Sequence, residues 1–200
     1  MGTRSESAAA TRRALVAAAL ELLDQAGPDA VTLRAIAARA GVSRGAPYGH
    51  FDGKTQLLAT LATATWNQLA DEVDAVLADT RLTPSDRLET AVRAFLDLAR
   101  RWPHRFALMF DTPADDVDAA AAAGRLQDLY VSVIATVVGD VDARRYTALL
   151  MSSAHGIAAM KASGHLNASK WEIGPDEPLR TLLDMVHATV ASTALHSSQP

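Results

Sequence analysis

The stretch from residue 32 to residue 54 constrains the fold more than any other part of the chain, because it is typical of two short helices joined by a tight turn. Thr32 stands just before the first helix, where its hydroxyl can accept a hydrogen bond from an exposed backbone amide. Gly41 is expected to end that helix, since a residue without a Cβ adopts the left-handed conformation of a C-terminal cap at little cost. Ser43 is then placed to cap the second helix. Together with apolar residues at helical spacing, these signals predict a helix-turn-helix with a buried face made by Leu33, Ile36, Ala37 and Ala40.

The second helix, expected from about Arg44 to His50, carries polar side chains with almost no bulky apolar residue between them. Arg44 is placed to reach a guanine edge or a phosphate, whereas Tyr48 and His50 can donate to phosphate oxygens. The remaining positions are glycine, alanine and proline, so part of any sequence preference would come from methyl contacts and DNA shape. Lys54 then opens a long helix, whose free amides and positive dipole end favour a phosphate. The stretch therefore predicts a DNA-reading element.

Residues 11 to 61 carry many residue types at set spacings, and together they resemble the amino-terminal DNA-binding domain of the tetracycline-repressor family of transcriptional regulators. The matching residues are Ala18, Leu22, Leu23, Gly27, Val31, Thr32, Leu33, Ile36, Ala37, Ala40, Gly41, Val42, Ser43, Tyr48, His50, Phe51, Lys54, Leu57 and Leu58. The resemblance implies a homodimer that represses transcription from a palindromic operator in double-stranded DNA and releases it when a small-molecule effector binds. It also implies a supporting phosphate contact from Arg12 or Arg13. The residues and the resemblance together assign the DNA contacts to Thr32, Arg34, Ser43, Arg44, Gly45, Ala46, Tyr48, His50 and Lys54.

Charge and composition are consistent with this hypothesis. Residues 1–54 hold seven Arg or Lys against five Asp or Glu, whereas the whole chain has a net charge of −4, so a basic end precedes an acidic body. The chain has no cysteine, which excludes disulfides and thiolate metal sites and fits a reducing cytoplasm. No apolar run approaches the ~20 residues of a membrane span, and residues 1–11 lack the hydrophobic core of a secretion signal. We therefore expect a cytoplasmic protein that does not contact the membrane.

Helical periodicity continues through the remaining sequence, which predicts an all-α fold. Residues 1–10 are small and polar and are expected to form a frayed arm. A DNA-binding domain is expected over residues 1–55 and a helical ligand-binding and dimerisation domain over residues 56–200, joined by the long helix after Lys54. The β-branched run from Val131 to Val138 would locally suit a strand, but no partner strand is visible, so it is kept helical. The expected helices cover residues 12–26, 33–40, 44–50, 54–77, 84–101, 106–110, 114–138, 141–163 and 178–196.

Aromatic and sulfur-containing residues gather in the second domain, and they are most simply core residues. The alternative is that they line an effector pocket made by Trp66, Phe95, Trp102, Phe106, Met109, Phe110, Tyr130, Met151 and His155. Residues 151–160 resemble a His-Gly signature found in one branch of the family, carried here by His155 and Gly156. That branch often has a tryptophan shortly before the pair, where this chain has Met151 and Ser152. His155 on an apolar helix is more often a hydrogen-bonded core residue than a ligand contact.

The last two long helices are poor in charge and predict a dimer interface. One presents small side chains that let a partner helix approach closely, and the other has a wide apolar stripe. Two such helices and their symmetry copies would bury a four-helix interface, and a twofold dimer matches a palindromic operator.

No sequence motif indicates a metal, a cofactor or catalysis. The six histidines include no pair four residues apart and no His-Glu-x-x-His motif, and the chain has no nucleophile elbow, phosphate-binding loop or dinucleotide fingerprint. Two alternatives remain open at this point. One is a constitutive DNA-binding regulator without an effector pocket, and the other is a helical-bundle enzyme that uses His155 with an acid such as Asp128.

Overall fold

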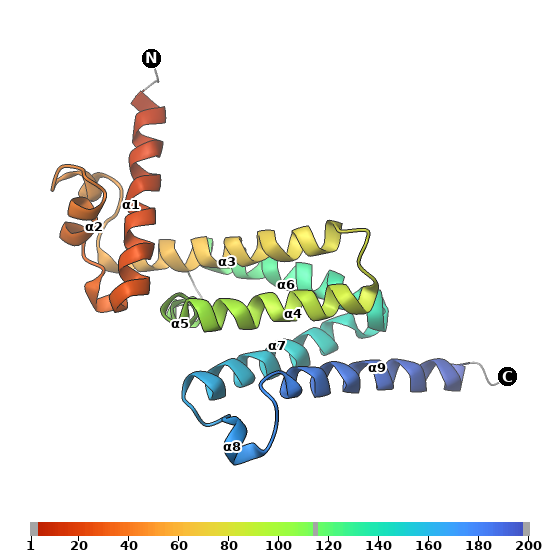
Figure 1. Ribbon diagram of the computed structural model, residues 1–200. Helices are drawn as coiled ribbons and strands as arrows, with labels where there is room; N and C mark the ends of the chain where they lie inside the picture. Colours follow the sequence, from red (N-terminus) through yellow and green to blue (C-terminus); the bar gives the residue numbers. More distant parts are fainter. Residues whose placement is uncertain (1–3, 114–115, 198–200) are drawn as a thin grey trace. The chain divides into compact units, whose positions relative to one another are not determined.

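The computed structural model describes residues 4–113 and 116–197, and this part of the chain contains helices and no strand (Figure 1). The all-α prediction is confirmed. The elements in chain order are α1 (Arg4–Ala26), the 3₁₀ helix η1 (Pro28–Ala30), α2 (Leu33–Arg39), the 3₁₀ helix η2 (Ala46–Gly49), α3 (Lys54–Ala78), α4 (Pro84–Arg101), α5 (Pro103–Asp111), α6 (Val117–Val138), α7 (Asp140–Ala162), α8 (Ala168–Trp171) and α9 (Glu177–Ser197). No helix in the described ranges is long and apolar enough to cross a lipid bilayer.

The chain folds into two compact units. Within the described residues, unit 1 takes in residues 4–68, 102–113 and 116–123, and unit 2 takes in residues 69–101 and 124–197. The boundaries between the units fall within α3, between α4 and α5, and within α6, so α3 and α6 each contribute residues to both units. The expected boundary after residue 55 divides a DNA-binding domain from a ligand-binding and dimerisation domain, and it stays a prediction.

Unit 1 is built around the helix-turn-helix, in which α2 lies against α1 (Figure 1). Its core contains large apolar side chains from α1, α2 and α3, and it includes Leu108 from α5. Burying these side chains is the main source of the unit's stability, at about 25 cal/mol per Å² of apolar surface. The buried residues are Leu15, Ala19, Leu23, Val31, Ile36, Phe51, Leu57, Leu61, Ala62 and Leu108.

The first helix begins earlier than expected. Residues 4–10 belong to α1, so the expectation of a frayed arm is wrong for them, and residues 1–3 lie outside the described part of the chain. The segment contains three consecutive alanines, which have the highest helix propensity, and an established helix extends at low cost. Residues 5–10 are exposed, as their composition suggested.

The caps around α2 are confirmed. The Thr32 hydroxyl oxygen accepts the backbone N–H of Ala35 at 3.1 Å. Gly41 has a φ of 68°, and the N–H of Val42 returns to the carbonyl of Ala37 at 3.1 Å, as in a Schellman motif. Both ends of α2 are therefore fixed by residues adjacent to it in sequence.

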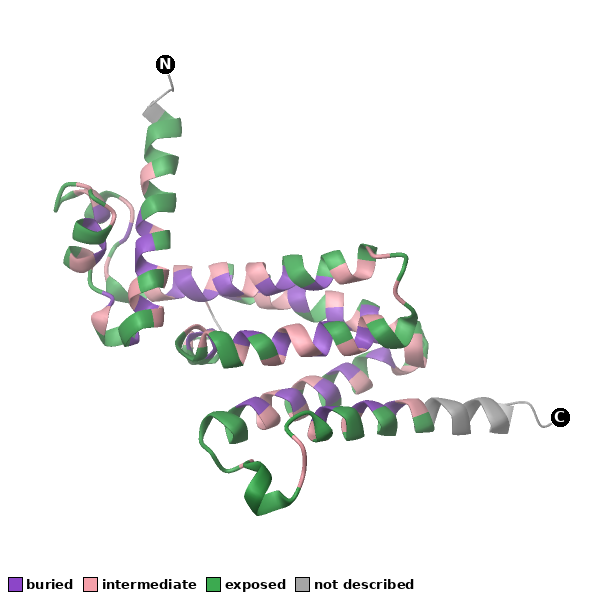
Figure 2. Ribbon diagram, viewed as in Figure 1, coloured by how far each residue is buried: buried purple, intermediate pink, exposed green. Residues whose placement is uncertain are grey.

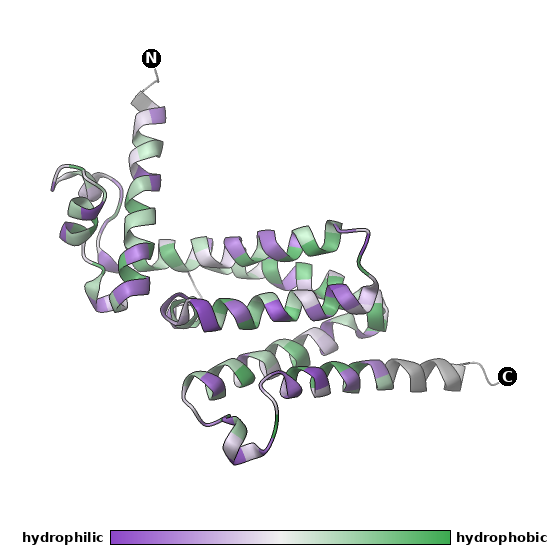
Figure 3. Ribbon diagram, in the orientation of Figure 1, coloured by the Kyte–Doolittle hydropathy of each residue, from purple (hydrophilic) through white to green (hydrophobic). Residues whose placement is uncertain are grey.

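Unit 2 holds α4, α7 and α9, with α7 in contact with both of the others. Helix α4 is amphipathic, and hydrophobic and hydrophilic residues alternate along it (Figure 3). It buries Leu88, Ala91, Val92, Phe95 and Leu98. The run from Val131 to Val138 lies within α6, so its helical assignment is confirmed. The connection between α7 and α9 is mostly exposed and includes α8, which the sequence did not predict (Figure 2).

Candidate nucleic-acid interface

The segment that follows α2 is a turn and a 3₁₀ helix rather than the expected helix from Arg44 to His50. The N–H of Ala46 donates to the Ser43 carbonyl at 3.0 Å, and the N–H of His50 donates to the Pro47 carbonyl at 3.0 Å. Pro47 has no N–H to donate, so it cannot complete an α-helical ladder here. The expected Ser43 cap is also wrong, because Gly45 occupies the N-cap position of η2 and no side chain caps it.

Two buried side chains anchor this segment, while most of its other residues are exposed. Pro47 is buried, and Phe51 is 2% exposed within the core of unit 1. Tyr48, between them, is 68% exposed. An exposed tyrosine at this position is well placed to donate its hydroxyl proton to a phosphate oxygen. Arg44 and Gly49 are exposed as well. Residues 43–50, here called the reading segment, are therefore a short, mostly exposed segment that Pro47 and Phe51 attach to the core of unit 1.

The reading segment, residues 43–50, contains two glycines that keep ordinary backbone conformations. Gly45 has a φ of −84°, and Gly49 is not among the glycines with positive φ. A Cβ at either position would meet no heavy atom within 4 Å. Neither glycine is therefore required by local strain or by close packing.

The first turn of α3 makes two polar contacts with residues outside the helix, one from Lys54 and one from Gln56. The Lys54 ammonium lies 3.7 Å from a carboxylate oxygen of Asp29, whose side chain is fully exposed. Such a pair contributes little, so Lys54 can turn to a phosphate without a large loss. The Gln56 side chain accepts the backbone N–H of Asp52 at 2.6 Å, which secures the turn between the reading segment and α3.

All nine residues assigned to DNA contact lie in unit 1, and none is buried. Ala46 and His50 are half-buried, and the other seven are exposed: Thr32, Arg34, Ser43, Arg44, Gly45, Tyr48 and Lys54. The Thr32 oxygen accepts from Ala35, which leaves its O–H proton available for a phosphate oxygen. Arg12 stacks over the ring of Phe51 at 5.5 Å from the ring centre, so it supports the residue that anchors the reading segment.

The nine residues assigned to an effector pocket fall in both units. Trp66, Trp102, Phe106, Met109 and Phe110 belong to unit 1, and Phe95, Tyr130, Met151 and His155 belong to unit 2. In unit 1 the Phe110 ring packs edge-on against Trp66 with centroids 5.3 Å apart, and it also contacts Phe106. Phe106 is 8% exposed, whereas Phe110 is 45% exposed, so this aromatic cluster reaches from the core to the surface of unit 1. A pocket role for the set stays a prediction.

Tyr130 is a hydrogen-bonded core residue of unit 2. It is 1% exposed, and its hydroxyl donates to the backbone carbonyl of Ala91 at 2.8 Å. Burial raises the pKa of Tyr130 well above its ordinary value, and the negative charge of Glu72 raises it further. The phenol is therefore neutral at any physiological pH.

Sequence reasoning missed the residues of α5 that hold the helix-turn-helix. Arg105 donates to both carboxylate oxygens of Asp24 on α1, and Leu108 enters the core of unit 1. The ring of His104 lies 3.3 Å from where a Cβ on Gly27 would stand. No periodic or capping signal connects residues so far apart in sequence, so only the folded structure reveals this contact.

Comparison with known proteins places both parts of the chain. Residues 15–61 match the family model for bacterial regulatory proteins of the tetR family, and residues 88–186 match a tetracyclin repressor-like C-terminal domain. The transcriptional regulator CymR from Pseudomonas putida is 38% identical over 102 residues, which is 48% of this chain and 48% of that protein. The match thus spans about half of the length of that relative.

Solved structures extend the similarity to nearly the whole chain. A protein of unknown function from Rhodococcus sp. RHA1 is 27% identical with a TM-score of 0.76, covering 90% of this chain and 94% of that one. The structure described as a SmeT–triclosan complex is 22% identical with a TM-score of 0.59, covering 90% and 91% of the two chains, and shows the fold alone. The matched family consists of regulators, which removes the enzyme alternative that pairs His155 with Asp128. The chain belongs to the tetracycline-repressor family and is a DNA-binding transcriptional regulator.

Proposed function

We propose that the protein is a ligand-responsive repressor that binds a palindromic operator as a homodimer and releases it when a small molecule binds the part of the chain from residue 56 to residue 200. The observation that carries this proposal is the reading segment, where Tyr48 is 68% exposed between the buried anchors Pro47 and Phe51. Its site of action is the cytoplasm, where bacterial DNA lies.

Within the interface, we assign different tasks to the polar and the small residues. Arg44 reads a base edge, since its guanidinium can contact both acceptors of a guanine. Thr32, Tyr48, His50 and Lys54 contact phosphates and set the position of the segment in the major groove. Arg34 and Ser43 add phosphate contacts, and Gly45 and Ala46 allow the backbone to approach the bases closely.

The dimer forms through α7 and α9. Apolar side chains on these helices face solvent in the single chain, namely Leu149 at 51% and Met160 at 37% on α7 and Met185 at 62% on α9. A twofold axis would place these side chains against their symmetry copies. It would also set two reading segments about 34 Å apart, which is one turn of DNA.

Effector binding shifts the dimer toward a spacing of the reading segments that no longer fits the operator. A coupling free energy of about 1–3 kcal/mol is enough for a useful switch. Support for a small, apolar or aromatic effector comes from the aromatic residues assigned to the pocket. The solved SmeT–triclosan complex, which shares the fold, offers a precedent for a small-molecule complex.

The first test is the selection of bound sequences from a random duplex pool with purified protein, repeated over a range of salt concentrations. We expect a palindrome whose affinity falls with salt, because phosphate contacts release counterions. That operator then serves as the probe in a screen for molecules that release it. Recovery of no sequence at any salt concentration would contradict operator binding. An operator that no compound releases would favour the constitutive regulator.

A further inference from the structure

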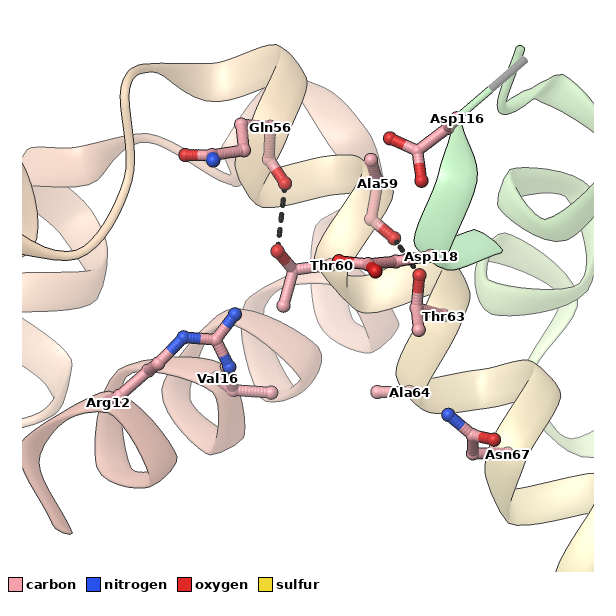
Figure 4. Close-up of a pocket in the computed structure, with 10 residues that line it drawn as sticks. All are labelled: Arg12, Val16, Gln56, Ala59, Thr60, Thr63, Ala64, Asn67, Asp116 and Asp118. Atoms are coloured by element: carbon pink, nitrogen blue, oxygen red, sulfur yellow. Dashed lines mark hydrogen bonds between the residues drawn. The ribbon is translucent and has the colours of Figure 1, made fainter. Parts of the chain in front are cut away.

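Unit 1 contains a pocket of about 410 Å³ (Figure 4). One of its lining residues, Arg12, is one of the two arginines for which the family resemblance implies a supporting phosphate contact. Helices α1 and α3 and the start of α6 form its walls, and all of its lining residues belong to unit 1. None of them is among the nine residues assigned to DNA contact or the nine assigned to the effector pocket. The pocket therefore needs an explanation of its own.

Opposite charges stand on two sides of the pocket. Arg12 projects from α1 on one side (Figure 4). On the other side are Asp116, which directly precedes α6, and Asp118, which lies in the first turn of α6. No ion pair joins Arg12 to either carboxylate among the interactions of the described residues, and its guanidinium stacks on the ring of Phe51. One oxygen of Asp116 accepts the N–H of Ala119 at 2.9 Å, which fixes that side chain. One positive and two negative side chains thus line the same pocket, and no ion pair among the described residues joins the arginine to either carboxylate.

The wall between the charges offers hydrogen-bonding groups. The hydroxyl of Thr60 donates to the Gln56 carbonyl at 2.9 Å, so its lone pairs remain able to accept. The side-chain amide of Asn67 also lines the pocket, and no hydrogen bond links it to another described side chain. An amide of this kind can both donate to and accept from a ligand.

We propose that this pocket binds a small zwitterion of the α-amino-acid class. The ligand carboxylate pairs with Arg12, its ammonium group lies between Asp116 and Asp118, and its polar side chain meets Asn67. A simple anion would approach two carboxylates, and a simple cation would face the guanidinium, so each would meet repulsion that a zwitterion avoids. Arginine also binds a carboxylate through two parallel hydrogen bonds, which favours this orientation.

Ligand binding in the pocket would act on the reading segment through two of its lining residues. Arg12 stacks on Phe51, and the side chain of Gln56 holds the backbone of Asp52. A ligand whose carboxylate draws Arg12 toward it would weaken the stacking of Arg12 on Phe51, the residue that anchors the reading segment. This site is distinct from the effector site proposed above, and its occupancy can be measured without operator DNA.

The test is calorimetric titration of the full-length protein with each of the twenty common amino acids. The tightest binder is then compared with its carboxamide, which lacks the carboxylate, and its N-acetyl derivative, which lacks the ammonium group. We expect each derivative to bind at least about tenfold more weakly, because a charge-assisted hydrogen bond is lost. Asp118→Asn should weaken binding of the free amino acid by a similar factor, and so should Arg12→Gln. Asp128→Asn removes an exposed carboxylate on α6 outside the pocket, so it should leave the affinity unchanged.

Three results would overturn the proposal. The first is the absence of binding by all twenty amino acids at about 10 mM, the weakest affinity of practical interest. The second is equal affinity of Asp118→Asn and Asp128→Asn for the tightest binder, which would place the ligand elsewhere. The third is equal binding of the carboxamide and the free amino acid, which would make the ligand a simple cation. Because Asp118 is exposed, its substitution leaves the fold intact even if Arg12→Gln disturbs the packing on Phe51.

Discussion

Arg105 of α5 and Asp24 of α1 form a two-pronged ion pair, with an Nε–Oδ1 distance of 2.7 Å, although 81 positions separate them in the sequence. Their side chains are only 12% and 23% exposed. The pair fastens α5 to the end of α1, close to where Leu108 enters the core of unit 1. Unit 1 therefore includes a helix that lies outside residues 15–61, the range that matches the family model of the DNA-binding domain.

Replacing Arg105 by glutamine should lower the free energy of unfolding by about 2–3 kcal/mol, because the mostly buried carboxylate of Asp24 loses its charged partner. Urea denaturation followed by circular dichroism measures this difference. The matched control is Arg100→Gln, whose pair with Asp97 is 74% and 58% exposed and should contribute less than about 1 kcal/mol. Equal losses in the two variants would mean that burial of the pair does not matter.

Gly27→Ala should destabilise the protein more than Gly41→Ala. Both glycines have positive φ, 75° and 68°, so alanine costs about 1 kcal/mol at either site through backbone strain. A Cβ at Gly41 would meet nothing within 4 Å, whereas one at Gly27 would stand 3.3 Å from the ring of His104. Thermal unfolding of the two variants gives the comparison. In a His104→Ala background the difference should disappear, and its persistence would contradict the role of the ring.

Tyr130 gives the protein a characteristic pH dependence. Its pKa is raised in the folded state, so above pH 10 the unfolded chain releases a proton that the folded chain keeps. The contribution of this residue is therefore fully present below pH 10 and falls by about 1.4 kcal/mol for each pH unit above it. Urea denaturation between pH 8 and about 11 should show a steeper loss for the original chain than for Tyr130→Phe. At neutral pH the variant should be about 1 kcal/mol less stable, since it lacks the hydrogen bond to Ala91.

Arg44 and Lys54 should affect operator binding in different ways. Arg44→Ala should weaken binding by about 1–3 kcal/mol and relax the preference at one base pair, as expected for a base contact. Lys54→Gln should weaken binding on every sequence and reduce the slope of log affinity against log salt by about 1. Fluorescence anisotropy with operator variants at several salt concentrations separates the two effects. Arg100→Ala, at an exposed position on α4 outside both the reading segment and the proposed dimer helices, should leave both quantities unchanged. An equal loss on all sequences for Arg44→Ala would reassign it to a phosphate.

The local parts of the fold could be predicted because their causes lie within a few residues. The Thr32 cap and the Gly41 Schellman motif depend on hydrogen bonds between near neighbours, and both are found where the sequence placed them. The Ser43 cap was wrong for an equally local reason, since the Pro47 ring favours a turn in which Ser43 supplies its carbonyl instead of its hydroxyl. The short helix α8 was missed, although Asn167 caps it through a bond from the N–H of Lys170, a signal the sequence contains.

The candidate sites also differ in whether their residues are near neighbours in the sequence. The DNA-contact set lies within residues 32–54, and the expectation that its second element faces outward agrees with the exposure of Arg44 and Tyr48, whereas Ala46 and His50 are half-buried. The pocket of unit 1 collects side chains from three helices, and neither Arg12 nor Asp118 belongs to any periodic pattern that points to the other. The Arg105–Asp24 pair is likewise a product of how α5 packs on α1. Sequence patterns indicate contacts between residues close together in the chain, whereas these contacts join helices that are far apart in the sequence.

The open space around Gly45 and Gly49 has an evolutionary consequence. Because neither glycine has positive φ and neither would bring a Cβ within 4 Å of another heavy atom, both positions can acquire side chains without disturbing the core. Pro47 and Phe51 hold the segment in place independently of them. A duplicated copy of this gene could therefore drift to a different operator through single substitutions at these two positions while keeping its stability. The segment separates the residues that maintain the fold from those that natural selection can use to diversify recognition.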